Sequence, residues 1–250
     1  MVRSARKRAE SEVYHVMTRG VGRQVIFEDD ADRRFYLAVL SEELASHDGE
    51  LLAWCLMDNH VHLLVRMRLE ELSELMRALG SAYASFFNRR HDRVGHLFQD
   101  RFRSEPMESE AYLLTVVRYI HQNPVAAGLA PSCEYRWSSY RAYLGLPCEG
   151  VPTECDAVLS MLGGVDGFVG FHRALDDDAA CIDVEERGVV SAERAREVAG
   201  VALGGVRVEE VFSLPRPERN RALRALRDAW LSVRQIERLT GVSRGVISRV

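Results

Sequence analysis

The sequence predicts an α+β fold built on an antiparallel sheet. A strand-like segment precedes a helix, two further strand-like segments are joined by a short polar turn, and two helical segments follow. The resulting order is strand, helix, strand, strand, helix, helix. Because strands joined by a tight turn run antiparallel, we expect the two adjacent strands to form a hairpin within this sheet. A ferredoxin-like core fits this order of elements best.

The first strand and the first helix are expected near the N-terminus. Residues 13–18 have the composition of a strand, and the glycine-containing turn at residues 19–22 follows directly. Residues 30–47 have a helical pattern of apolar side chains and begin with acidic residues. Acidic residues in a first turn interact favourably with the helix dipole, which supports a helix start at Asp30.

A hairpin and a long helix are expected next. Residues 51–57 and 60–67 are strand-like, and Asp58 and Asn59 between them form a short polar turn. Apolar residues then recur every three or four positions, as the buried stripe of a helix requires. The stripe consists of Leu69, Leu72, Met76, Leu79, Tyr83 and Phe86.

Another helix is expected at residues 109–122. Ser109 can cap its N-terminus, and Pro124 is expected to end it. Since a residue before proline avoids the helical region, Asn123 should lie in the last turn.

Charge divides the chain into three parts. Residues 1–145 carry 19 basic and 20 acidic side chains, residues 146–190 carry 2 and 10, and residues 191–250 carry 12 and 7. We therefore expect a nearly neutral main domain at 1–145, an acidic linker or loosely structured segment at 146–190, and a helical basic region at 191–250.

The C-terminal region has the pattern of a helix-turn-helix. A helix at residues 217–231 precedes a helix at 233–240, Gly241 provides the turn, and a second helix starts at Arg244. The small core expected between the helices consists of Ile236, Leu239, Val242 and Ile247. Arg238 and Arg244 would then contact DNA phosphates. A plain helical hairpin has similar spacing and remains an alternative.

Composition excludes several classes of protein. Hydrophobic residues make up 47% and charged residues 28% of the 250 residues, which is typical of a soluble globular protein. No apolar run reaches the roughly 20 residues of a membrane span. The five cysteines form no CxxC pair, so the sequence predicts a reduced, cytoplasmic protein without a disulfide framework or a thiolate zinc site.

Two short patterns carry residues suited to metal-assisted chemistry. His60 and His62 are two residues apart on an expected strand, so both imidazoles face the same side and can bind one divalent cation. Tyr119 and Asn123 are four residues apart on an expected helix and share one face. Such a helix can present a phenol and an amide oxygen to the histidines. Taken separately, each pattern is also compatible with structural histidines or a half-buried tyrosine.

A cluster of arginines follows the long helix. Two phenylalanines, Phe98 and Phe102, lie within it. Guanidinium groups contact phosphates and aromatic rings stack on unpaired bases, so this composition suits single-stranded nucleic acid. A solvated loop with two aromatic anchors is the alternative. The candidate DNA-binding residues here are Arg89, Arg90, Arg93, Arg101 and Arg103.

Four stretches of the sequence resemble the single-tyrosine HUH transposases, most closely the REP-associated tyrosine transposases. The first is Tyr14-His15-Val16-Met17-Thr18-Arg19-Gly20, and the second runs from Met57 through His60-Val61-His62 to Val65. The third runs from Tyr119 through Asn123-Pro124-Val125 to Leu129, and the fourth is Trp137-Ser138-Ser139-Tyr140. The resemblance covers residues 13–144, and several motifs in the same order are far more specific than one His-x-His pair.

The resemblance implies a function and roles for the matching residues. His60 and His62 would bind Mg²⁺ or Mn²⁺, Asn123 would be a third ligand, and Tyr119 would attack a DNA phosphodiester to give a 5′-phosphotyrosine. The partner would be single-stranded or hairpin (palindromic) DNA, and the protein would act as a monomer or homodimer without contacting a membrane. One departure is Asp58, which replaces the proline usual before Asn59-His60.

Two other functions remain open from the sequence. The chain would be a domesticated regulator if it bound hairpin DNA without cleaving it. It would be a hydrolytic metalloenzyme if the histidines activated water and Tyr119 were structural. Intact His60, His62, Tyr119 and Asn123 favour the transposase, because a DNA-binding protein has no evident need for all four.

Overall fold

The chain divides into two compact units in a computed structural model that describes residues 7–173, 196, 199–204, 206–228 and 233–247. The first, called the sheet unit, consists of residues 1–125 and 129–181, and the second, called the helical unit, consists chiefly of residues 182–250. We describe each unit by itself.

The sheet unit is built on four antiparallel strands with the order β2-β3-β1-β4. The strands are β1 (Val13–Arg19), β2 (Glu50–Leu56), β3 (His60–Arg66) and β4 (Arg103–Pro106). With α1 (Asp30–Ser46) after β1 and α2 (Leu69–Arg90) after β3, the chain follows a β-α-β-β-α-β path. This path and strand order confirm the expected α+β, ferredoxin-like fold. The short edge strand β4 was not predicted.

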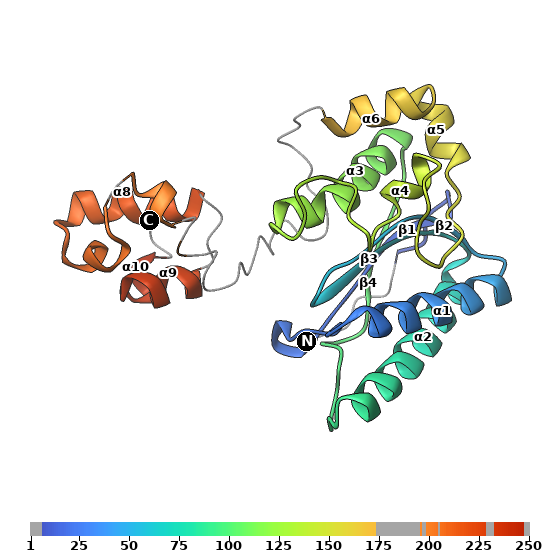
Figure 1. Ribbon diagram of the computed structural model, residues 1–250, viewed down its shortest axis with the longest axis horizontal. Coiled ribbons are helices and arrows are strands. Elements are labelled where there is room, and N and C mark those ends of the chain that lie inside the picture. The colour runs from blue at the N-terminus through green and yellow to red at the C-terminus, as the bar shows by residue number, and fades with distance from the viewer. Residues whose placement is uncertain (1–6, 174–195, 197–198, 205, 229–232, 248–250) are drawn as a thin grey trace. The chain divides into compact units, whose positions relative to one another are not determined.

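One face of the sheet is covered by α1 and α2, as Figure 1 shows. The side chains of Tyr14 and Val16 from β1 point toward these helices and join the main core. The predicted stripe of α2 is buried there, with Leu69 and Phe86 only partly covered. A capping box at the start of α1, formed by Asp29 and Asp32, satisfies backbone N–H groups that the first turn leaves unpaired.

The opposite face of the sheet carries α3 (Glu110–Ala126) (Figure 1). As predicted, Ser109 caps this helix, and its hydroxyl accepts a hydrogen bond from the backbone N–H of Tyr112 at 3.3 Å. The prediction that Pro124 ends the helix is wrong, because α3 continues to Ala126. So close to the end, proline removes only one N–H from the last turn, and its own carbonyl accepts hydrogen bonds from Leu129 and Ala130 at 2.8 and 3.3 Å.

Residues 146–173 differ from the expected linker. They contain α5 (Asp156–Leu162) and α6 (Val165–Arg173), and α6 packs against α4 (Tyr140–Tyr143). The buried rings of Phe168 and Tyr143 stack with centroids 4.4 Å apart. The expectation of a loosely built segment therefore does not hold for these residues, since a few well-placed aromatic side chains outweigh the glycine-rich composition. The acidic run at 176–178 lies outside the described residues.

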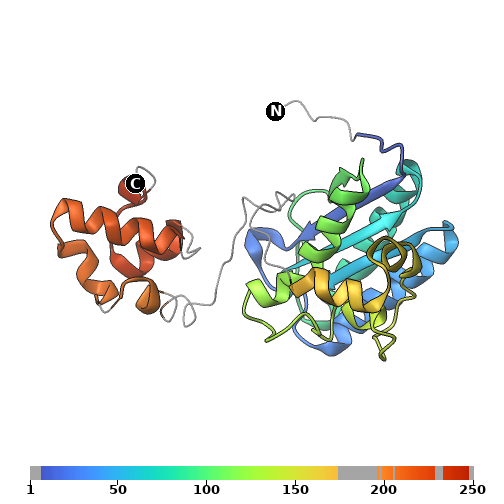
Figure 2. The ribbon, with the colours of Figure 1, turned by 90° about the horizontal axis from the view of Figure 1, so that it is seen from above.

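The described part of the helical unit consists of short helical elements, which cluster together in the view of Figure 2. They include η3 (Val208–Ser213), α8 (Arg216–Asp228), α9 (Val233–Thr240) and α10 (Arg244–Ile247). Gly241 has a φ of 73°, which places it in the left-handed region that a tight turn between α9 and α10 uses. Ile236, Val242 and Ile247 are buried and Leu239 is partly buried, which agrees with the small core predicted between these helices.

No helix within the described ranges combines the length and apolar character that crossing a membrane requires.

Candidate active site

The structure brings together the two histidines and the two helix residues singled out in the sequence. β3 places His60 and His62 on the sheet face that carries α3, with their ring centroids 4.9 Å apart. The ring of Tyr119 meets the ring of His62 edge to face at 5.6 Å. Asn123, one helical turn later, places its side-chain Nδ2 3.4 Å from Nε2 of His62. The two histidines on one face of β3 and the two residues on one face of α3 thus meet at the same place.

The side chain of Asn59 determines which nitrogen of His60 carries the proton. Nδ2 of Asn59 donates a hydrogen bond to the carbonyl of Arg23 at 3.3 Å, which turns its Oδ1 toward Nδ1 of His60 at 2.7 Å. Since an amide oxygen only accepts, Nδ1 of His60 is the donor. Nε2 of His60 therefore keeps a lone pair that can bind a cation.

A third histidine, His15, lies beside His62. Nε2 of His15 and Nδ1 of His62 are 3.0 Å apart, and the two rings stack with centroids 5.2 Å apart. The ring of His15 also approaches that of Tyr119, with centroids 6.1 Å apart. The sequence did not assign His15 to the site, because the facing direction of β1 follows from its register with β3 and not from strand alternation alone.

Burial keeps these imidazoles neutral. Desolvation and, to a smaller extent, the positive charge of Arg19 lower the pKa of His60 to about 4, and a hydrogen bond to Asn123 opposes this shift. Desolvation also lowers the pKa of His62 well below its usual value, with contributions from His60 and His15. The pKa of His15 falls to about 3 through burial. Neutral imidazoles with free lone pairs are the form that binds a metal ion.

The donor set fits one divalent cation. Two imidazole Nε2 atoms and the amide of Asn123 face a common place, and a 180° rotation of that amide would present its oxygen. Nowhere in the described ranges do three or more His, Cys, Asp or Glu side chains gather in an arrangement for a metal ion. A cation here would therefore be held by two histidines and an amide, with positions left for phosphate oxygens or water.

Asp58, which departs from the family pattern, is held by α1. Its Oδ1 accepts a hydrogen bond from Nη2 of Arg33 at 2.5 Å, and its backbone carbonyl accepts from Ile26 and Phe27. These contacts tie the β2–β3 turn to the helix side of the sheet. Asp58 therefore stabilises the hairpin that positions His60.

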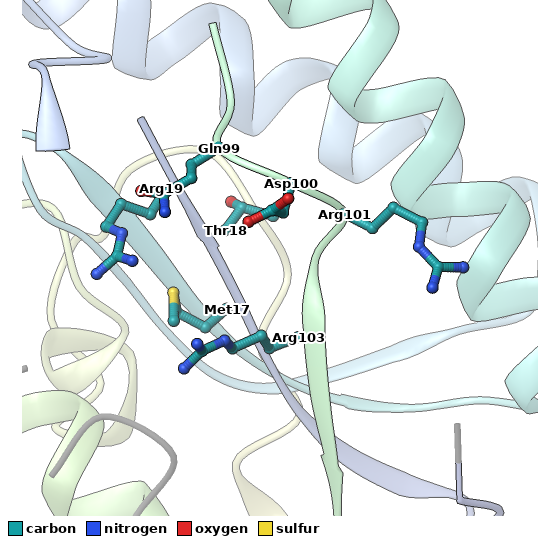
Figure 3. Close-up of a pocket in the computed structure, with 7 residues that line it drawn as sticks. All are labelled: Met17, Thr18, Arg19, Gln99, Asp100, Arg101 and Arg103. Atoms are coloured by element: carbon teal, nitrogen blue, oxygen red, sulfur yellow. The ribbon is translucent and has the colours of Figure 1, made fainter. Parts of the chain in front are cut away.

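Two of the predicted DNA-binding arginines line a pocket near the histidines. The pocket is partly open to solvent, has a volume of about 40 Å³, and is lined by Met17, Thr18, Arg19, Gln99, Asp100, Arg101 and Arg103. Figure 3 shows the Arg19 and Arg103 side chains on one side of β1 together with Met17, whereas Arg101 points away from them. Arg19 pairs with His60 across the β1–β3 ladder, which places the pocket beside the histidine site.

The other predicted DNA-binding arginines lie elsewhere. Arg90 forms ion pairs with Asp29 and Asp32 at the start of α1, at 2.6 Å each, so its positive charge is neutralised within the fold. Arg93 donates a hydrogen bond to Gln24. Arg89 is exposed at the end of α2. In the helical unit Arg238 is exposed on α9, and Arg244 begins α10 with a side chain outside the described part.

Comparisons with known proteins agree with this site. The model of one protein family, described as IS200-like transposase, matches residues 9–123, slightly less than half of the chain. The matched range contains β1, the β2–β3 hairpin and α3 as far as Asn123, and thus all four candidate residues. A search of curated proteins found no match.

Two solved structures resemble the fold. One is a REP-associated tyrosine transposase bound to a REP hairpin, with a TM-score of 0.49, 15% identity, and coverage of 62% of this chain and 93% of that one. The other is a protein from Deinococcus radiodurans R1 assigned as a transposase, with a TM-score of 0.33, 21% identity, and coverage of 49% and 95%. Both scores lie below 0.5, so neither likeness carries weight. The family match therefore shows that residues 9–123 are similar to the IS200-like transposases.

Proposed function

We propose that this chain binds single-stranded or hairpin DNA and cleaves and rejoins it through Tyr119, with one divalent cation, Mg²⁺ or Mn²⁺, held by His60, His62 and Asn123. The observation that carries the proposal is the meeting of a tyrosine, two imidazoles and an amide on one face of the sheet. The IS200-like family match over the same residues supports it.

The chemistry is a phosphoryl transfer to the tyrosine oxygen. The phenol oxygen of Tyr119 attacks the phosphorus of one phosphodiester, a new O–P bond forms, and the bond to the 3′-oxygen breaks. The phenol proton leaves as the bond forms, and the released 3′-oxygen takes up a proton. The product is a 5′-phosphotyrosine and a free 3′-hydroxyl, which can reverse the reaction on another strand without ATP.

The surrounding residues lower the barrier by position and charge. A free phenol has a pKa near 10 and is a weak nucleophile, so the scissile phosphate must be made more electrophilic. A bound cation supplies this by neutralising charge that develops on the phosphate oxygens. The rings of His15 and His62 contact Tyr119 edge to face and restrict its orientation. Such positioning supplies much of the rate in phosphoryl transfer.

The DNA strand is expected to reach the site past the arginine pocket. Arg19 and Arg103 flank Met17 on the histidine side of β1, and Arg19 is the cross-strand neighbour of His60 (Figure 3). Guanidinium groups bind phosphates in a fork geometry, so this pair can hold the backbone next to the scissile phosphate. In the helical unit, α9 and α10 provide a second DNA contact through Arg238 and Arg244.

The proposal is tested by trapping the covalent intermediate. Purified full-length protein is incubated with end-labelled single-stranded hairpin DNA from the flanks of its own gene, with Mn²⁺ or Mg²⁺, and analysed for a denaturant-stable adduct. We expect the adduct with the wild type and its loss in Tyr119→Phe and after chelation. Tyr112→Phe is the matched control, because Tyr112 lies on α3 two turns earlier, and it should keep the adduct.

Other outcomes separate the alternatives. DNA binding without an adduct under any metal identifies a hairpin-binding regulator. Metal-dependent cleavage that persists in Tyr119→Phe identifies a hydrolytic enzyme and overturns the role of Tyr119.

A further inference from the structure

The contact between His15 and His62 is a hydrogen bond between two neutral side chains. Their nitrogens are 3.0 Å apart, and both side chains are fully buried, with 0% exposure. One nitrogen donates and the other accepts. If Nε2 of His15 donates, the proton of His62 lies on Nε2 and blocks cation binding there. If Nδ1 of His62 donates, Nε2 of His62 keeps its lone pair.

The side chain of Asn123 distinguishes these two arrangements. Its Nδ2, which only donates, faces Nε2 of His62 at 3.4 Å. Nε2 of His62 is therefore the acceptor, and the ring proton lies on Nδ1. It follows that His62 donates to Nε2 of His15, and that the proton of His15 lies on its own Nδ1.

A carboxylate lies beside the remaining proton of His15. In the β1–β4 ladder His15 is directly opposite Glu105, so both side chains are on the same face of the sheet. Nδ1 of His15 and Oε2 of Glu105 are both buried, and neither has a hydrogen-bond partner. A buried N–H and a buried carboxylate oxygen without partners are costly, and one water that bridges them would satisfy both.

We propose that His15 is a positioning residue for the cation site: it accepts the Nδ1–H of His62, holds the His62 lone pair toward the cation, and is linked by its own Nδ1–H to Glu105 through one water. This inference rests on the proposed cation site. His15 thus does for His62 what Asn59 does for His60, so that both histidines present Nε2. Metal-binding histidines generally donate their second ring N–H to such a partner, which orients the ring and raises its basicity.

The first test examines the wild type without metal or DNA. Long-range ¹H–¹⁵N correlation spectra of full-length protein with ¹⁵N-labelled histidine distinguish Nδ1–H from Nε2–H rings. Assignment uses His→Gln variants. We expect Nδ1–H for His60, His62 and His15. An Nε2–H tautomer of His62 overturns the proposal, whatever the protein does to DNA.

The second test measures Mn²⁺ binding by calorimetry on the full-length chain without DNA. His15→Leu removes the acceptor and should weaken Mn²⁺ binding by about 10- to 100-fold, the range found for outer-shell partners. His15→Gln restores an acceptor and should recover part of the affinity. Glu105→Gln keeps the shape of the side chain and should give a smaller loss.

Val13→Ala is the matched control, because Val13 is a buried residue of β1 on the same face, two positions before His15. It should lower stability without changing Mn²⁺ affinity. Mn²⁺ affinity within twofold of wild type in a folded His15→Leu variant contradicts the proposal. Because neither test uses DNA cleavage, failure of the proposed reaction and failure of this inference give different results.

Discussion

The sheet unit contains two buried histidine clusters. In each, two imidazole nitrogens lie 3.0 Å apart, but the clusters differ in what the remaining ring nitrogens contact. In the first, on the sheet face, His15 and His62 approach to 3.0 Å. In the second, on the other side of α3, Nδ1 of His121 and Nε2 of His172 also approach to 3.0 Å. Desolvation lowers the pKa of histidines in both clusters.

In the second cluster, the remaining ring nitrogens contact a backbone carbonyl and a hydroxyl group of the protein. Nδ1 of His172 donates to the carbonyl of Phe168 at 2.9 Å, and Nε2 of His121 lies 2.8 Å from the hydroxyl of Ser139. The first cluster leaves the lone pairs of His60 and His62 beside Asn123 and Tyr119. A buried histidine is therefore structural when backbone and hydroxyl groups use both nitrogens, and a candidate ligand when one nitrogen faces a place where a cation fits.

The largest expected difference between the clusters is in metal affinity. His62→Gln removes a proposed ligand and should weaken Mn²⁺ binding by more than about 100-fold, beyond the effect of an outer-shell partner. His121→Gln should change the affinity by less than about threefold, although it disturbs the same helix. Calorimetric titration of both variants checks this. Equal losses of Mn²⁺ affinity in the two variants would contradict the assignment of His62 as a ligand and His121 as a structural residue.

A second prediction concerns the free energy of unfolding at acid pH. An unfolded histidine binds a proton near pH 6.5, whereas burial lowers the pKa of His172 to about 4. Between these values the unfolded state binds more protons, so stability falls as the pH drops from 6.5 to 4. His172→Gln should reduce this fall by about 3.5 kcal/mol at most, since one pKa unit corresponds to about 1.4 kcal/mol.

Urea unfolding at several pH values measures this slope. The control is His96→Gln, because His96 is exposed. At pH 7 Mn²⁺ at 100 times its dissociation constant should add about 2.7 kcal/mol to the stability of both the wild type and His172→Gln. An unchanged acid slope in His172→Gln would contradict the assignment of a lowered pKa to that residue.

The smallest expected effect concerns DNA binding by two arginines, one whose charge is paired within the fold and one that is exposed. Arg90 is held by Asp29 and Asp32, whereas Arg103 is exposed at the pocket. Arg103→Gln should weaken single-stranded DNA binding and reduce the slope of log affinity against log salt by about 0.7 to 1, the value of one phosphate contact. Arg90→Gln should lower stability but leave that slope unchanged. Fluorescence anisotropy over a salt series measures both, and a smaller slope in Arg90→Gln would restore Arg90 as a DNA contact.

Local patterns in the sequence predicted most of the elements that build the site. The helix at residues 30–47, the hairpin around Asp58-Asn59 and the α2 stripe are confirmed, because periodicity and turn residues act over short distances. The edge strand β4 was missed, since its four residues, Arg103–Pro106, have no strand-like alternation and pair only because β1 leaves an open edge. The helices α5 and α6 were missed because the glycines between them and within α6 resemble a linker.

The sequence by itself determined the α+β order of elements, the shared face of His60 and His62, and the shared face of Tyr119 and Asn123, because each depends on the period of one strand or one helix. Only the tertiary structure decided that His15 and Glu105 lie beside that site and that Arg90 binds the start of α1. Strand register and helix packing bring together residues that are distant in sequence, and no local pattern encodes which of their faces meet.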